Sequence, residues 1–269
     1  MKLPRVTVAL SAAWGALLLS RSLSENDFFW HLTLGREVAR AGARVITEPV
    51  AFTWGVPQTL AVPEWLWDLL AWRAFEVSET AAAVFVSVCG ALAAGAIAAF
   101  VASEVKVRAL VPAFTALVLC VASVRLKERP ETLALAFAAV FLVLSRRLVS
   151  SFSWPLTGAL VTLEIVWAQT HGTFVLALPF FVACALDATP ALRGRLAGVA
   201  GALLLGLFTG PAGVGVLSFL SSHVAGDAVR HIIDMSAPTW SDFNPASQPY
   251  HFIAALLSLA ALPGLFPSR

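Results

Sequence analysis

The stretch Thr80–Ser103 reads TAAAVFVSVCGALAAGAIAAFVAS and contains no charged side chain. A helix of about 20 apolar residues is long enough to cross the hydrocarbon core of a bilayer. Similar apolar runs, separated by short charged turns, recur along the chain, in which 59% of the residues are hydrophobic and only 13% are charged. A soluble domain carries about 25% charged residues. The composition therefore predicts an all-α, polytopic membrane protein.

Working outward from this run, we expect a single membrane domain over residues 1–269 with about eight spanning helices. The candidate spans are 5–23, 80–103, 109–124, 131–147, 152–169, 172–188, 196–212 and 250–266. The first span starts with basic residues, but no small-residue cleavage site follows it, so we expect it to remain as an anchor. Two longer segments, 24–79 and 213–249, are expected to be loops on the outer face.

The orientation depends on residues 64–77, which are too short and too charged for a span and contain Trp65, Trp67 and Trp72. Tryptophan rings favour the level of the lipid headgroups, so we expect a juxtamembrane helix there. With the N-terminus inside, the inner turns then carry the basic pairs Lys106 and Arg108, Arg146 and Arg147, and Arg193 and Arg195. This agrees with the positive-inside rule. If 64–77 spans instead, the last two pairs move outside.

The first outer loop begins with Glu25-Asn26-Asp27-Phe28-Phe29-Trp30-His31, directly after the first apolar segment. We expect a short helix over 31–42 that lies on the membrane and ends at Gly42. In the preferred orientation all five histidines fall on the outer face. Lys and Arg are scattered in ones, twos and threes, which excludes a nucleic-acid surface.

Asp27, His31 and Arg129 are candidate functional residues at the outer ends of spans. Asp27 is either a carboxylate for proton transfer or a helix cap. His31 shares a helical face with Asp27 and could orient it, bind a metal or simply form a hydrogen bond with it. Arg129 is either a phosphate ligand or an anchor paired with a neighbouring glutamate.

Glu164 lies within an apolar span, where a carboxylate is costly and usually functional. Residues 164, 168 and 171 share a helical face, which predicts that Glu164 points toward His171; its alternative role is an interhelical hydrogen bond. Gln169 and His171 either belong to a site or end a helix. His31, His171 and His231 are weak candidates for a divalent metal, because no pair has helical ligand spacing. No cofactor is predicted with certainty.

Several short motifs, taken in order, resemble a group of bacterial membrane proteins similar to the GT-C superfamily of polytopic glycosyltransferases. This superfamily includes protein O-mannosyltransferases and lipid A aminoarabinose transferases. The motifs are Asp27 to His31, Gly35, Glu48 to Thr53, Glu64-Trp65-Leu66, Arg129-Pro130-Glu131, Trp167 to Gly172 and Gly210 to Gly213. Members usually have Asn-x-His-Gly and Asn-Pro-Tyr-Gly where this chain has Gln169-Thr170-His171-Gly172 and Gly210-Pro211-Ala212-Gly213. The chain also resembles a shortened member.

The resemblance implies a site on the outer face of the bacterial inner membrane and a sugar donor linked to polyprenyl phosphate. It implies that Asp27 is the catalytic acid, with His31 beside it. Glu64, Arg129, Glu164, Gln169 and His171 are the residues expected to bind substrate or phosphate. The expected partners are membrane lipids and the polyprenyl-phosphate sugar.

Two alternatives remain open at this point. The first is a non-catalytic GT-C-like scaffold or subunit with a membrane-protein partner. The second is a lipid or solute transporter, which the gathering of polar residues on one face disfavours.

Overall fold

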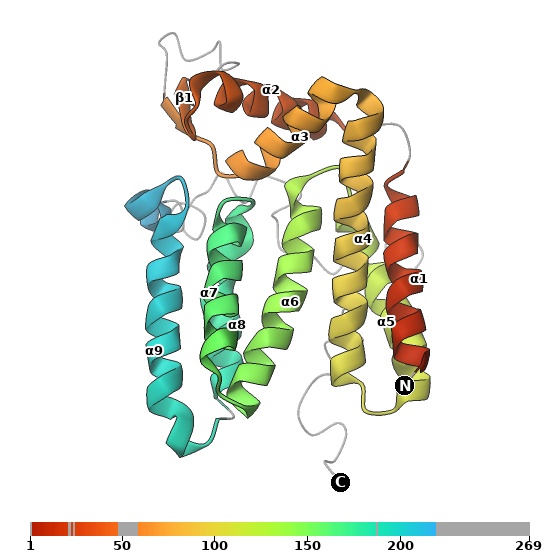
Figure 1. Cartoon of the computed structure of the whole chain (residues 1–269), viewed down its shortest axis with the longest axis vertical. Helices are drawn as coiled ribbons and strands as arrows, with labels where there is room; N and C mark the ends of the chain where they lie inside the picture. The colour runs from red at the N-terminus through yellow and green to blue at the C-terminus, as the bar shows by residue number, and fades with distance from the viewer. Residues whose placement is uncertain (1, 21–22, 24, 48–58, 187, 219–269) are drawn as a thin grey trace, which may run out of the picture.

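The computed structural model describes residues 2–20, 23, 25–47, 59–186 and 188–218. Helices stand side by side in a bundle, and a smaller layer lies across one end of it (Figure 1). The predicted span 250–266, His231 and most of the loop 213–249 lie outside the described residues.

The bundle consists of apolar helices joined by short turns. Its helices are α1 (Lys2–Leu18), α4 (Glu79–Glu104), α5 (Val111–Ala122), α6 (Pro130–Ser150), α7 (Trp154–Ala168), α8 (Ala177–Ala185) and α9 (Pro190–Gly206). Short 3-10 turns lie between these helices, namely η2 (Arg108–Leu110), η3 (Ser123–Arg125) and η4 (Gly172–Leu176). Two more, η5 (Leu207–Thr209) and η6 (Gly213–Gly215), follow α9. One core cluster of this bundle is centred on Phe141, Trp167 and Phe181, each almost completely buried.

Three helices among the described residues are long and apolar enough to cross a membrane: Glu79–Glu104, Pro130–Ser150 and Pro190–Thr209. Four shorter apolar helices accompany them: Leu3–Leu18, Arg108–Ala122, Trp154–Ala168 and Gly172–Ala185. The all-α, membrane-type prediction is therefore supported, whereas the prediction of about eight spans is not. Breaks at Ser123–Pro130 and at Gln169–Leu176 leave the shorter helices below the usual spanning length.

The layer across the end, which we call the cap, contains α2 (Asn26–Ala41) and α3 (Trp65–Val77). The helix expected over 31–42 begins five residues earlier than predicted, whereas α3 agrees with the helix expected over 64–77. The expected stop at Gly42 is confirmed: this residue has a φ of 61° and donates its backbone N–H to Val38 O. An unexpected antiparallel pair, β1 (Val45–Thr47) and β2 (Thr59–Ala61), follows with Ile46 opposite Leu60. This small hairpin departs from the all-α prediction.

Gly35 brings the two cap helices into contact. A Cβ at this position would overlap the carbonyl oxygen of Asp68 in α3. Only glycine therefore allows α2 and α3 to approach this closely. Phe28 and Trp67, both fully buried, extend the contact to α4 through Phe85.

Candidate functional site

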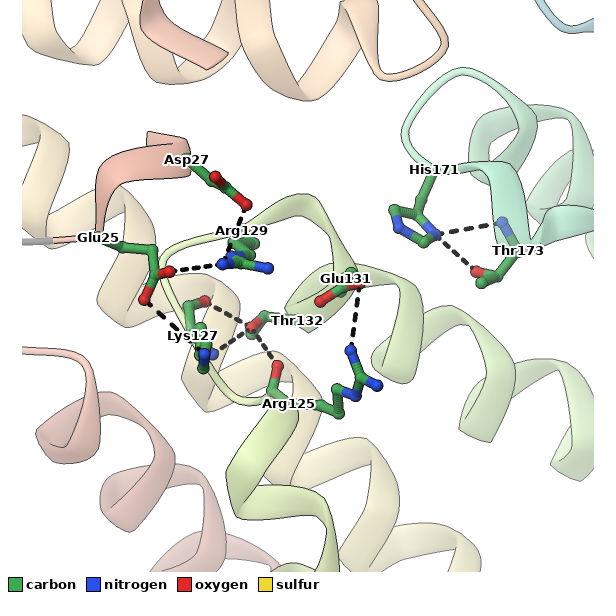
Figure 2. A network of polar contacts seen from close by, with 9 residues as sticks. All are labelled: Glu25, Asp27, Arg125, Lys127, Arg129, Glu131, Thr132, His171 and Thr173. Carbon is green, nitrogen blue, oxygen red and sulfur yellow. Dashed lines mark hydrogen bonds and ion pairs between the residues drawn. The ribbon is translucent and has the colours of Figure 1, made fainter. Parts of the chain in front are cut away.

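Asp27 and Arg129 meet where the cap contacts the bundle (Figure 2). Arg129 Nη2 lies 2.9 Å from Asp27 Oδ2 and 2.5 Å from Glu25 Oε1. The Arg129 side chain is 17% exposed, while that of Asp27 is 53% exposed. Glu25 and the neighbouring carboxylates raise the pKa of Arg129 against the effect of burial. Ion pairs therefore join the N-terminal end of α2 to the start of α6. Of the two carboxylates that contact Arg129, that of Asp27 is the more exposed to solvent.

The turn before α6 fixes Arg129 in this position. Thr132 Oγ1 donates to Lys127 O at 2.6 Å and accepts from Lys127 N at 3.0 Å. Pro130 occupies the first turn of α6, where a backbone N–H would have no partner within the helix, so proline costs no hydrogen bond there. Lys127 Nζ adds a longer contact of 3.9 Å to Glu25 Oε2. Arg129 therefore projects from a stiff turn rather than from a loose loop.

His31 pairs with Asp68 of α3, not with Asp27, which corrects the sequence expectation. His31 Nδ1 lies 2.7 Å from Asp68 Oδ1, and the two side chains are 13% and 0% exposed. Burial lowers the pKa of His31, but the hydrogen bond and charge of Asp68 outweigh it and raise the pKa overall. Burial likewise raises the pKa of Asp68, against the influence of His31. Burial and the mutual hydrogen bond are thus the main influences on both groups, which join α2 to α3.

Glu64 lies just before α3 and belongs to the same polar cluster. Burial, and then the charge of Asp68, raise its pKa to about 7. Its carboxylate is also in hydrogen-bond contact with the backbone of Gly172. Two sequence motifs far apart in the chain, Glu64-Trp65 and His171-Gly172, are therefore in contact.

His171 accepts a hydrogen bond from the backbone N–H of Thr173 at 3.1 Å and caps η4. Burial, with a smaller contribution from His31, lowers its pKa to about 4. In Figure 2 His171 lies across Glu131 from Arg129. This residue is a neutral cap at neutral pH, which favours the structural alternative over a ligand role.

Gln169 joins the cap to the bundle. Its Oε1 accepts from Trp65 Nε1 at 2.9 Å and its Nε2 donates to Thr209 O at 3.0 Å. Its backbone oxygen accepts from Leu66 N at 3.1 Å. With its amide group fully used, Gln169 is a structural connector.

Glu164 is fully buried in α7 and faces α9, not His171 as predicted. A Cβ at Gly206 would overlap its Oε2. Helix α7 ends at Ala168 and His171 is extended, so residues 164 and 171 do not share a helical face. Among the described residues, neither oxygen of Glu164 has a hydrogen-bond partner.

The candidate residues thus fall into three groups rather than one. Within the described part of the chain, no set of three or more His, Cys, Asp or Glu side chains is arranged to hold a metal ion. Sequence reasoning missed Asp68 and the role of Glu25. The spacing of Glu64 and Asp68, one helical turn apart among tryptophans, was a signal that could have identified Asp68.

Comparisons of the chain with protein-family models, with curated proteins and with solved structures gave no match.

Proposed function

We propose that the protein is an integral membrane glycosyltransferase that moves a sugar from a polyprenyl-phosphate donor to an acceptor hydroxyl at the cap end. One observation carries the proposal. Asp27, half exposed, lies against Arg129 at the boundary between an apolar bundle and its polar cap. A carboxylate can take the proton of the acceptor hydroxyl, and a guanidinium can stabilise the charge on the leaving phosphate.

In the proposed reaction, the acceptor oxygen forms a bond to the anomeric carbon of the donor sugar. The bond from that carbon to the phosphate oxygen breaks, and its electron pair leaves with polyprenyl phosphate. The Asp27 carboxylate takes the proton of the acceptor hydroxyl. Arg129 stabilises the negative charge that develops on the phosphate.

A pocket of about 360 Å³ near the same end of α2 offers space for the start of a prenyl tail. Leu23, Phe29, Phe75 and Ala83 form its apolar side, and Ser20, Glu79 and Thr80 form its polar side. Phe29 is two residues from Asp27, so the pocket and the ion pair depend on the same turn of α2. This placement supports a lipid-linked donor over a soluble one.

The remaining candidates act as positioning residues in this proposal. His31 and Asp68 hold α2 against α3, and Glu64, Gln169 and His171 hold the cap against the bundle. A loose cap would misplace Asp27 relative to Arg129, and small misplacements are enough to slow a reaction strongly.

The proposed topology places the N-terminus inside and the cap outside the bacterial inner membrane, with the shorter apolar helices completing the spans. A membrane-impermeant thiol reagent tests it in the variants E37C, on α2, and R147C, at the far end of α6. We expect labelling of the first from outside and of the second only after permeabilisation. The reverse pattern contradicts the topology.

Asp27→Asn tests the catalytic role in membranes supplied with a polyprenyl-phosphate sugar. We expect sugar transfer to fall by about a hundredfold or more, because the proton acceptor is lost. Glu37→Gln is the matched control, since Glu37 is on the same helix and pairs only with Arg36 and Arg40 among the described residues. Transfer by Asp27→Asn at the wild-type rate would rule out Asp27 as the base.

A non-catalytic scaffold is the second candidate, and the closure of the polar contacts favours it. Arg129 Nη2 contacts Glu25 and Asp27, and His31 Nδ1 contacts Asp68, without any ligand, while Arg129 Nε has no hydrogen-bond partner among the described residues. The two candidates differ in one outcome. Binding of a membrane-protein partner that survives Asp27→Asn, together with no transfer by the wild type, supports the scaffold.

A further inference from the structure

Another pocket, with a polar lining, lies at the end of the bundle opposite the cap, between the last turns of α4 and α6 and the first turn of α7. Its volume is about 610 Å³. Its lining residues are Ser103, Glu104, Val143, Arg146, Arg147, Ser150, Ser151, Ser153 and Leu156. The proposed glycosyl transfer uses none of these residues.

The charges in this pocket are not balanced. Arg146 Nη2 lies 3.1 Å from Glu104 Oε2, which fixes it across α4 and α6. Arg147, on the next position of α6, is exposed and makes no ion pair within the described residues. One guanidinium therefore remains to meet an anion, at the position where α6 ends.

Four serines, Ser103, Ser150, Ser151 and Ser153, line the same pocket as Arg147. Ser150 Oγ donates to Arg146 O at 2.8 Å and Ser103 Oγ to Phe100 O at 2.7 Å, so these two are engaged. Ser153 precedes α7 but its side chain makes no capping hydrogen bond. A guanidinium with nearby hydroxyls is suited to phosphate oxygens, which accept several hydrogen bonds at once.

The pocket also has an apolar side that a free phosphate would not use. Val143 lies two turns deeper along α6 than Ser150, and Leu156 lies inside the first turns of α7. Beside the pocket, the ring of Trp154 is 73% exposed and packs edge-on against Phe152. An exposed tryptophan beside arginines at the end of apolar helices is typical of the headgroup level of a bilayer.

We propose that this pocket binds the phosphate group of an anionic phospholipid, with Arg147 as its main ligand and the first acyl carbons against Val143 and Leu156. The lipid would hold the ends of α4, α6 and α7 together. This site is independent of the proposed transfer reaction at the opposite end.

The test uses the full chain purified in a neutral detergent, with dioleoyl phosphatidylglycerol, dioleoyl phosphatidylcholine or inorganic phosphate added. We expect phosphatidylglycerol alone to raise the Tm and to remain bound in native mass spectrometry. For Arg147→Gln we expect about fivefold weaker binding of phosphatidylglycerol, the effect of one cation at an anionic lipid surface. Arg147→Lys retains the charge and should keep most of the binding.

Arg108→Gln is the matched control, because Arg108 lies at the same end of the bundle, in η2, outside the pocket. We expect it to bind phosphatidylglycerol like the wild type. Equal stabilisation by the two lipids, an equal effect of inorganic phosphate, or an equal loss in Arg108→Gln would each overturn the proposal. Circular dichroism of each variant checks that loss of binding does not reflect loss of the fold.

Discussion

Asp27 and His31 lie one turn apart on α2, yet they belong to two different environments. Asp27 is half exposed and pairs with Arg129 of α6, whereas His31 is nearly buried and pairs with the fully buried Asp68 of α3. Water screens the first pair and not the second. Adjacent turns of one helix thus carry a solvent-accessible group and a buried one, because each turn contacts a different partner.

The two pairs should also differ in what they contribute to stability. A buried pair that loses one partner leaves a desolvated polar group behind, while a partly exposed pair exchanges its partner for water. The four predictions below test this difference, from the largest expected effect to the smallest.

Asp68→Ala should lower the free energy of unfolding by about 3 kcal/mol, because it leaves His31 buried without its partner. Asp27→Ala should lower it by less than about 1 kcal/mol. Thermal or denaturant unfolding in detergent micelles measures both. Equal losses for the two variants would remove the distinction between the pairs.

Gly35→Ala should destabilise the protein by about 2 kcal/mol, because the added methyl group forces α2 away from α3. The buried pair His31–Asp68 spans the same two helices and should lengthen with it. Gly194→Ala, where a Cβ meets nothing within 4 Å, is the control and should be neutral or slightly stabilising. An unchanged Tm for Gly35→Ala would contradict the close approach of the cap helices.

Glu64 should give the cap a stability that depends on pH. Its pKa rises from 4.5 to about 7 on folding, so the folded state favours the protonated acid. Its contribution to stability is therefore complete below pH 4.5 and is lost as the pH rises through 7. Relative to Glu64→Gln, the wild type should lose on the order of 2 kcal/mol between these two pH values.

Unfolding of both proteins at several pH values measures this difference. His171, whose lowered pKa has the opposite effect, is present in both proteins and cancels in the difference. A difference between wild type and Glu64→Gln that stays constant from pH 4.5 to 7 would show that Glu64 titrates normally in the folded protein.

Salt should affect only the exposed pair. Asp27→Asn should cost about 0.5 kcal/mol at low ionic strength, and this cost should disappear near 1 M salt because exposed charges are screened. The cost of Asp68→Ala should not change with salt. A salt-independent effect of Asp27→Asn, measured by unfolding at both ionic strengths, would mean that the Asp27 pair is shielded from solvent.

Several elements of the fold were predicted correctly from the sequence. The apolar run 80–103 became α4 almost residue for residue, and the helix predicted over 64–77 became α3. Gly42 ends α2 as expected, because glycine adopts a positive φ without strain. In contrast, the hairpin of β1 and β2 carried no strong periodic signal in its two three-residue strands, and it was missed.

The sequence by itself determined the helical, membrane-type class and identified Asp27, His31 and Arg129 as residues of interest. Hydrophobicity and helix stops are local properties, so they can be predicted from neighbouring residues in the sequence. Only the tertiary structure decided that Asp27 contacts Arg129, that His31 contacts Asp68, and that Glu164 faces Gly206. Those pairings depend on how helices far apart in the chain pack, and a helical face does not specify which helix it will meet.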